Sequence, residues 1–152
     1  MAEWGYGLLG PVEMRVDDQS VGLASASQRL VLAMLLLEAN RLVPAHRLID
    51  ELWGEALPAD PPAALRSQIS RLRRALGPAN GSLVAADGGY RLGLQRRQLD
   101  AARFEDSLAE AARTAGEQGL TILSAALGLW RGPALAELAG RPFARAGGCP
   151  AR

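Results

Sequence analysis

The chain has 152 residues, 49% of them hydrophobic, which is enough for one packed domain and a smaller appendage and excludes wholesale disorder. Seventeen basic residues, all arginine, face sixteen acidic ones, so the net charge of +1 identifies no partner by itself. The longest apolar run, residues 30–37, is too short to cross a bilayer, and the single cysteine, Cys149, allows no intramolecular disulfide. The first ten residues show no signal peptide, so we expect a cytoplasmic protein with no membrane partner.

The N-terminal residues are short and strand-like. Segments 6–9, 12–16 and 21–23 are rich in β-forming residues, and turn-forming residues separate them. We predict a small antiparallel β-meander.

Two helices follow the meander. The run RLVLAMLLLEA predicts a helix from an N-cap at Ser27 to about residue 39, buried on most sides because it is apolar nearly all round. A second helix is expected over residues 45–53, where Gly54 ends it. A loop over 54–61, with prolines at its end, leads to a third helix over 62–76.

The third helix has two contrasting faces. At 100° per residue, one face collects the apolar residues Leu65, Ile69, Leu72 and Leu76. The opposite face and its shoulders collect the small and polar residues Ala63, Arg66, Ser67, Gln68, Ser70, Arg71, Arg73 and Arg74. Small residues allow close approach to a duplex, and arginine pairs with guanine edges and with phosphates, so this face suits a major groove.

The distribution of charge along the chain favours the same interpretation. Residues 61–99 hold seven arginines and one acid, whereas residues 100–140 hold six acids and three arginines. The alternative is an ordinary amphipathic surface helix whose arginines form salt bridges. However, no acid lies between Pro62 and Leu76 to pair with them at helical spacing.

A hairpin and two more helices complete the pattern. Strands are expected at 83–85 and 89–94, around the turn Ala86-Asp87-Gly88, whose tip lacks a cation. Asp100 is the expected cap of the next helix, and a last helix is expected over residues 120–130. In this pair, we expect one apolar face to meet the other, with Phe104, Leu108, Ala111 and Ala115 against Leu123, Leu127 and Trp130.

These elements define an α+β fold. We predict a winged helix-turn-helix with an N-terminal antiparallel meander and a C-terminal β-hairpin wing, followed by a short all-α segment. The expected divisions are a DNA-binding domain over 1–97, a partial helical domain over 98–140 and a tail over 141–152.

The order of motifs resembles a known family. LLLEANRLVPAHRLIDELWG, then LRSQISRLRRALG and GGYRL, is similar to the OmpR/PhoB-type winged helix, and more closely to the Streptomyces antibiotic regulatory proteins, the SARP family. The resemblance covers about residues 5–96. LDAARFEDSLAEA through ALGLWRGPALAEL is similar to the start of the bacterial transcriptional activator domain.

The resemblance implies roles for individual residues. The third helix becomes the recognition helix and the hairpin becomes the wing. The implied DNA contacts are Arg66, Ser67, Ser70, Arg71, Arg73, Arg74, Trp53 and Arg91. For Trp53, an indole donating to phosphate and a core-edge aromatic remain equally open. The loop with Glu55, Leu57 and Asp60 is implied to face RNA polymerase holoenzyme.

The implied function is a sequence-specific transcriptional activator of an antibiotic or other secondary-metabolite gene cluster, which binds direct repeats in double-stranded DNA. The alternative is a protein-interaction module that docks on RNA polymerase or on a longer paralogue. No nucleophile–base pair points to an enzyme, and no cofactor or metal site is expected because His46 lies far from Cys149. The sequence leaves open whether the chain dimerises on DNA.

Overall fold

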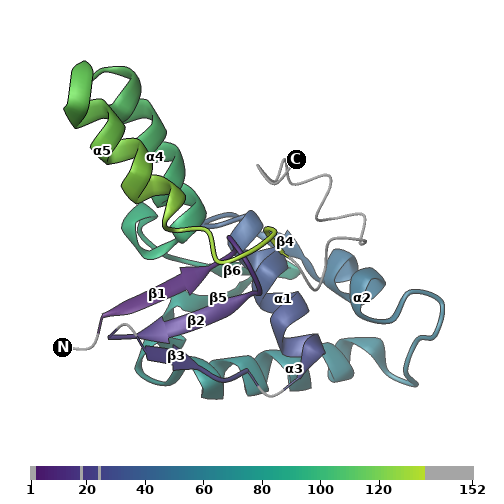
Figure 1. Ribbon diagram of the computed structural model, residues 1–152. Helices are drawn as coiled ribbons and strands as arrows, with labels where there is room; N and C mark the ends of the chain where they lie inside the picture. Colours follow the sequence, from purple (N-terminus) through teal and green to yellow (C-terminus); the bar gives the residue numbers. More distant parts are fainter. Residues whose placement is uncertain (1–2, 18, 24, 136–152) are drawn as a thin grey trace. The chain divides into compact units, whose positions relative to one another are not determined.

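The computed structural model describes residues 3–17, 19–23 and 25–135, so the tail predicted over 141–152 lies outside the described residues. Contacts between Cα atoms group the chain into two compact units (Figure 1). The winged-helix unit is Val21–Leu94, and the hairpin–helix unit joins Met1–Ser20 to Gln95–Arg152. No helix in the described residues is long and apolar enough to cross a membrane.

The winged-helix unit packs three helices against a small antiparallel sheet. The helices are α1 (Ala26–Leu37), α2 (Ala45–Trp53) and α3 (Pro61–Leu76), and each contacts the other two. The sheet has the order β4-β6-β5, with β4 at Val43–Pro44, β6 at Gly89–Leu92 and β5 at Leu83–Ala86. A 3-10 helix, η1 (Gly77–Ser82), joins α3 to β5.

All three predicted helices of this unit are present, although α1 ends two residues before the expected residue 39 and α3 begins one residue before the expected residue 62. Residues 30–36 of α1 are all buried, as a helix that is apolar nearly all round requires. Its N-cap is Ser25, whose Oγ accepts a hydrogen bond from the backbone N–H of Gln28 at 3.2 Å. The predicted cap at Ser27 is therefore wrong, because Ser27 already lies in the first turn. The bounds of α2 and its end at Gly54 are confirmed.

The hairpin–helix unit combines strands from the start of the chain with helices from its second half. Strands β1 (Trp4–Gly7), β2 (Glu13–Val16) and β3 (Gln19–Val21) form a sheet in that order, with β1 and β2 antiparallel. The predicted meander is present, but its first and third strands lie two residues before the expected segments 6–9 and 21–23. After η2 (Arg96–Gln98), helices α4 (Asp100–Ala112) and α5 (Gly116–Leu127) lie side by side (Figure 1).

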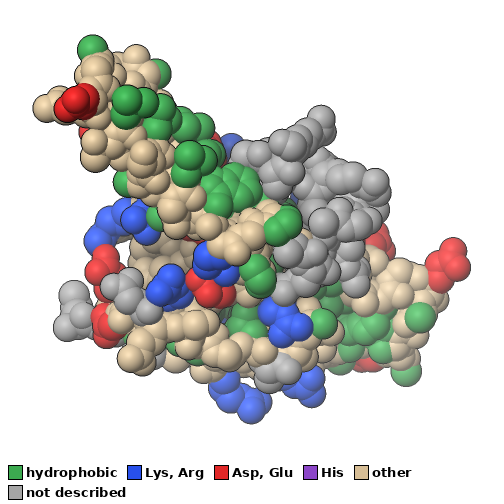
Figure 2. All heavy atoms as spheres, in the orientation of Figure 1, with side chains coloured by type: hydrophobic (Ala, Val, Ile, Leu, Met, Phe, Trp, Pro, Cys, Tyr) green, Lys and Arg blue, Asp and Glu red, His purple; other side chains and the backbone are tan. Residues whose placement is uncertain are grey.

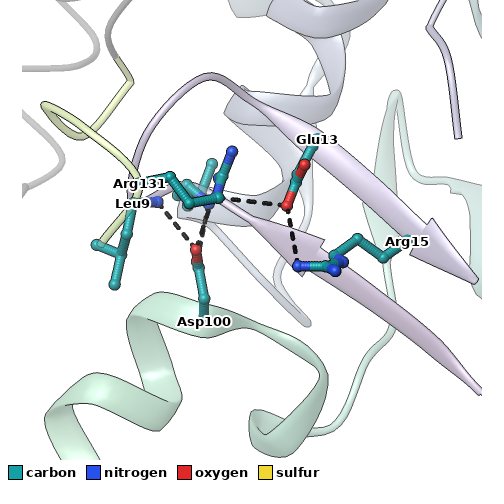
Figure 3. Close-up of polar contacts among 6 residues, drawn as sticks. Leu9, Glu13, Arg15, Asp100 and Arg131 are labelled. Carbon is teal, nitrogen blue, oxygen red and sulfur yellow. Dashed lines mark hydrogen bonds and ion pairs between the residues drawn. The ribbon is translucent and has the colours of Figure 1, made fainter. Parts of the chain in front are cut away.

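Polar contacts of Asp100 join the two parts of this unit (Figure 3). Its carboxylate accepts hydrogen bonds from the backbone N–H groups of Leu8 at 2.8 Å and Leu9 at 3.1 Å. The Arg131 guanidinium lies 3.7 Å from the same carboxylate and 3.3 Å from that of Glu13. Asp100 is therefore not the cap that we predicted for α4, because its carboxylate oxygens accept hydrogen bonds from the loop after β1 and not from the first turn of the helix. Leu99 occupies the N-cap position.

These contacts explain where the first twenty residues belong. We expected the strands of residues 1–20 in the same domain as the winged helix, but contacts group them with α4 and α5. The backbone supports this grouping, because Arg131 N–H donates to Leu9 C=O at 2.8 Å and Leu135 N–H donates to Leu8 C=O at 2.9 Å. The compact units are therefore discontinuous in sequence.

The contact predicted between α4 and the residues around α5 is partly present. The rings of Phe104 and Trp130 meet edge to face, with centroids 5.4 Å apart. However, Leu108 and Leu127 are 41% and 64% exposed, so much of their apolar surface is not covered by the contact that we expected. The last helix begins before the predicted residue 120 and ends before the predicted residue 130, so Trp130 lies beyond its end.

Candidate nucleic-acid interface

Helix α3 is fixed at both ends by its own sequence. The Asp60 carboxylate accepts a hydrogen bond from the backbone N–H of Ala63 at 3.2 Å and so caps the helix. Pro61 and Pro62 occupy the first turn, where the missing N–H groups need no partner. Gly77, with φ of 57°, ends the helix.

One face of α3 is entirely buried. The predicted apolar set, Leu65, Ile69, Leu72 and Leu76, is no more than 1% exposed at each position. Burial of these side chains against α1 and α2 fixes the rotation of the helix about its own axis. The opposite face must then point away from the core of this unit.

That opposite face carries free guanidinium groups. The predicted residues Arg66, Ser67, Ser70, Arg71 and Arg74 are all exposed. Among the described residues, none of these three arginines forms a hydrogen bond or an ion pair through its side chain. In contrast, Arg96, Arg97 and Arg131 each pair with a carboxylate of the hairpin–helix unit. Figure 2 shows basic side chains projecting along the edge where α3 lies in Figure 1.

Arg73 behaves differently from its neighbours. Its Nε and Nη2 atoms donate to the carbonyl oxygen of Leu83 at 3.4 and 3.2 Å. Leu83 is the first residue of β5, so this side chain joins the helix to the base of the wing. The sequence suggested a DNA contact here, and the structure adds an internal role that helical periodicity does not reveal.

The wing is a tight hairpin held on the body of the unit. Asp87 and Gly88 form its two-residue turn with φ of 40° and 80°, which is the sign pattern of a type I′ turn. Gly89 has no room for a side chain, because a Cβ there would collide with the carbonyl oxygen of Val43. Arg91 is exposed on β6, opposite Val84 of β5.

The two other predicted groups lie around α2 and the following loop. Trp53 is half-buried, and its indole N–H finds no hydrogen-bond acceptor among the described residues. Glu55 and Leu57 are exposed in the loop before α3, with Leu57 at 53%. Asp60 serves the helix as its cap, which is a structural role in addition to any contact with a partner.

His46 and Arg47 are exposed in the first turn of α2. Sequence reasoning placed His46 at the start of this helix and outside any metal site, but it did not single out Arg47. The Gln68 side chain buries its Oε1 atom without a hydrogen-bond donor among the described residues, although periodicity had placed it on an open shoulder.

Comparisons with known proteins agree with this geometry. Residues 18–92 match the family "Transcriptional regulatory protein, C terminal", and residues 99–149 match the "Bacterial transcriptional activator domain". The solved structure of Mycobacterium tuberculosis EmbR in complex with a low-affinity phosphopeptide is similar, with a TM-score of 0.87 and 37% identity. The match covers 96% of this chain and 41% of that one.

The curated relatives are transcriptional regulators. The chain is 44% identical to regulatory protein AfsR of Streptomyces coelicolor, over 92% of this chain and 14% of that protein. It is 36% identical to regulatory protein DnrI of Streptomyces peucetius, over 86% of this chain and 53% of that one. The chain thus spans only part of the length of these relatives.

The fold and the exposed basic helix define the class of the protein as a winged-helix transcriptional regulator with an OmpR/PhoB-type DNA-binding fold. The two domains in this order, together with the relatives AfsR and DnrI, place the chain in the SARP family of transcriptional regulators.

Proposed function

We propose that this chain is a sequence-specific activator that inserts α3 into the major groove at direct repeats in promoter DNA. The observation that carries the proposal is the free arginine face of α3, which lies opposite a fully buried apolar face. Guanidinium groups crowded on one helix repel one another unless an anion lies between them. Bases and phosphates of a duplex supply the guanine acceptors and the negative charge that this face lacks.

The proposal gives each predicted residue a task. Arg71 and Arg74, with Ser67 and Ser70, contact base edges, and Arg66 contacts the phosphates beside them. Trp53 and Arg91 donate hydrogen bonds to DNA phosphates on either side of the groove. Arg73 acts mainly as a positioning residue, because two of its nitrogens already bind the base of the wing.

Activation requires a second contact, and we propose that the loop between α2 and α3 makes it with RNA polymerase holoenzyme. Glu55 and Leu57 are exposed there. An acidic side chain beside an exposed leucine offers both charge and apolar area to a protein partner. Membership of the family of Streptomyces antibiotic regulatory proteins supports an antibiotic or other secondary-metabolite gene cluster as the target, and we propose that the protein acts in the bacterial cytoplasm.

An unbiased selection tests the function directly. Random duplexes are incubated with the purified chain at two salt concentrations, and the bound fragments are sequenced. We expect a short repeated motif, with binding constants that fall as salt rises with a log–log slope of about −0.9 for each phosphate contact. Recovery of fragments without a shared motif would contradict specific recognition.

A protein-interaction module remains the second candidate, and one observation favours it. Leu120, Leu123 and Leu127 of α5 are all exposed, at 65%, 36% and 64%, on one side of the helix. Exposed apolar stripes of this kind mark docking surfaces. A complex with RNA polymerase that persists at high salt without promoter DNA, together with an empty selection, would support this candidate instead.

A further inference from the structure

We infer that Asp87 at the wing tip makes the protein discriminate against A·T-rich sequence beside its major-groove site. The inference rests on the proposed function and concerns a different part of the site.

The base of the wing is cationic and its tip is anionic. Arg91 lies opposite Val84, two residues along β6 from Gly89, a rise of about 7 Å. Asp87 is the first residue of the turn and is exposed. Its carboxylate has no hydrogen bond or ion pair with any residue that the structure describes, so its charge is not neutralised within the unit.

The tip cannot swing away from its position without breaking backbone contacts. The carbonyl oxygen of Gly88 accepts a hydrogen bond from the backbone N–H of Ala45 at 2.9 Å. Strand β6 pairs with β4, and Arg73 holds the first residue of β5. The Asp87 carboxylate is therefore presented at a fixed place by the same body that positions α3.

A fixed carboxylate at this place favours some sequences over others. The resemblance to the OmpR/PhoB-type winged helix implies that the wing reaches the minor groove beside the major groove that α3 occupies, and we take this placement as part of the proposal. The minor groove is narrower in A·T tracts than in other sequences, and its electrostatic potential is more negative there. A carboxylate is therefore repelled more strongly by A·T tracts than by G·C sequence. Only guanine presents a hydrogen-bond donor there, its N2–H₂ group, which a carboxylate accepts. Asp87 thus disfavours A·T flanks and tolerates G·C flanks.

The substitution Asp87→Asn tests the inference cleanly, because Asn-Gly suits a type I′ turn as well as Asp-Gly does. The probes are two duplexes that share the site recovered by selection and differ only in their flanks, one an A-tract and the other G·C. The full chain and the variant are titrated against both. Glu110→Gln, which removes an exposed carboxylate on α4, is the charge-matched control.

We expect the wild-type chain to prefer the G·C-flanked duplex. Asp87→Asn should strengthen binding to the A-tract duplex by about two- to fivefold at low salt, with a smaller change on the other duplex. Glu110→Gln should leave the preference unaltered. Equal effects on both duplexes, or no effect on either, would overturn the inference while leaving the proposed function intact. If the wild-type chain binds neither duplex saturably, the proposed function fails first.

Discussion

Arg71 lies on the exposed face of α3, and its guanidinium is free of carboxylates among the described residues. We expect Arg71→Ala to weaken binding to the selected site by about 1–3 kcal/mol and to relax the preference at one base pair. The measurement is a titration against duplexes that carry each base at each position. The control is Arg113→Ala, which removes an exposed arginine from the other unit. An equal loss of affinity for every sequence would mean that Arg71 contacts the DNA phosphate backbone and not a base.

Tyr6 makes a prediction in alkaline solution. Burial raises the pKa of its phenol to about 12, because the charged form loses its hydration. Above pH 10 the unfolded chain releases this proton and the folded chain keeps it, so stability must fall as pH rises toward 12. The loss should approach about 2–3 kcal/mol.

The absence of lysine makes this effect measurable, because no ammonium group titrates in the same range. Unfolding by guanidinium chloride at pH 9 and pH 11.5 should show this loss of stability in the wild type and in Tyr90→Phe. Tyr6→Phe should show much less of it. An alkaline loss that is unchanged in Tyr6→Phe would assign the effect to other groups.

The residues also show which roles a local pattern can predict. Leu65, Ile69, Leu72 and Leu76 were predicted from their spacing because helix geometry alone puts them on one face. The partners of Asp100 could not be predicted, since Leu8 and Leu9 lie 92 and 91 residues away along the chain. A carboxylate just before an apolar run favours a cap locally, and only the tertiary fold shows that backbone N–H groups elsewhere bind it.

At the scale of the element, the wing depends on the missing side chain of Gly89. We expect Gly89→Ala to cost about 1–3 kcal/mol of stability, because its Cβ would collide with the carbonyl oxygen of Val43 and push β6 from β4. The control is Gly22→Ala, where a Cβ meets nothing within 4 Å. Thermal unfolding of both variants gives the comparison. Equal melting temperatures would mean that β4 yields without cost.

Helix α5 shows why an element boundary can be wrong when its type is right. The sequence analysis places the start of this helix at residue 120. The helix begins at Gly116, whose φ is 71°, and Gly119 packs against the carbonyl oxygen of Thr114, where a Cβ would not fit. Two glycines in four residues favour a loop by propensity, and close contact with the preceding turn outweighs that preference.

At the scale of the whole molecule, the chain crosses between its two units twice. Residues predicted as one DNA-binding domain, 1–97, are divided between the units, although the fold class and the order of elements follow the prediction. Sequence motifs report local periodicity and turns. They do not indicate which of the two units contains a short strand, because the residues that pack on β1 and β2 lie far away along the chain.

This organisation predicts how one side chain stabilises a distant part of the chain. The Asp100 side chain is only 12% exposed and binds two backbone N–H groups and Arg131. Asp100→Ala leaves those donors without their acceptor, at a cost of about 2–3 kcal/mol. Hydrogen exchange compares Asp100→Ala with the wild-type chain. The increase in exchange rate should be larger for the backbone amides of β1, α4 and α5 than for those of α1 and α3.

The control is Asp106→Ala, which removes a 57% exposed carboxylate paired with Arg96 and should cost less than about 1 kcal/mol of stability. Equal exchange rates in the two variants would mean that the Asp100 contacts do not hold the hairpin–helix unit together.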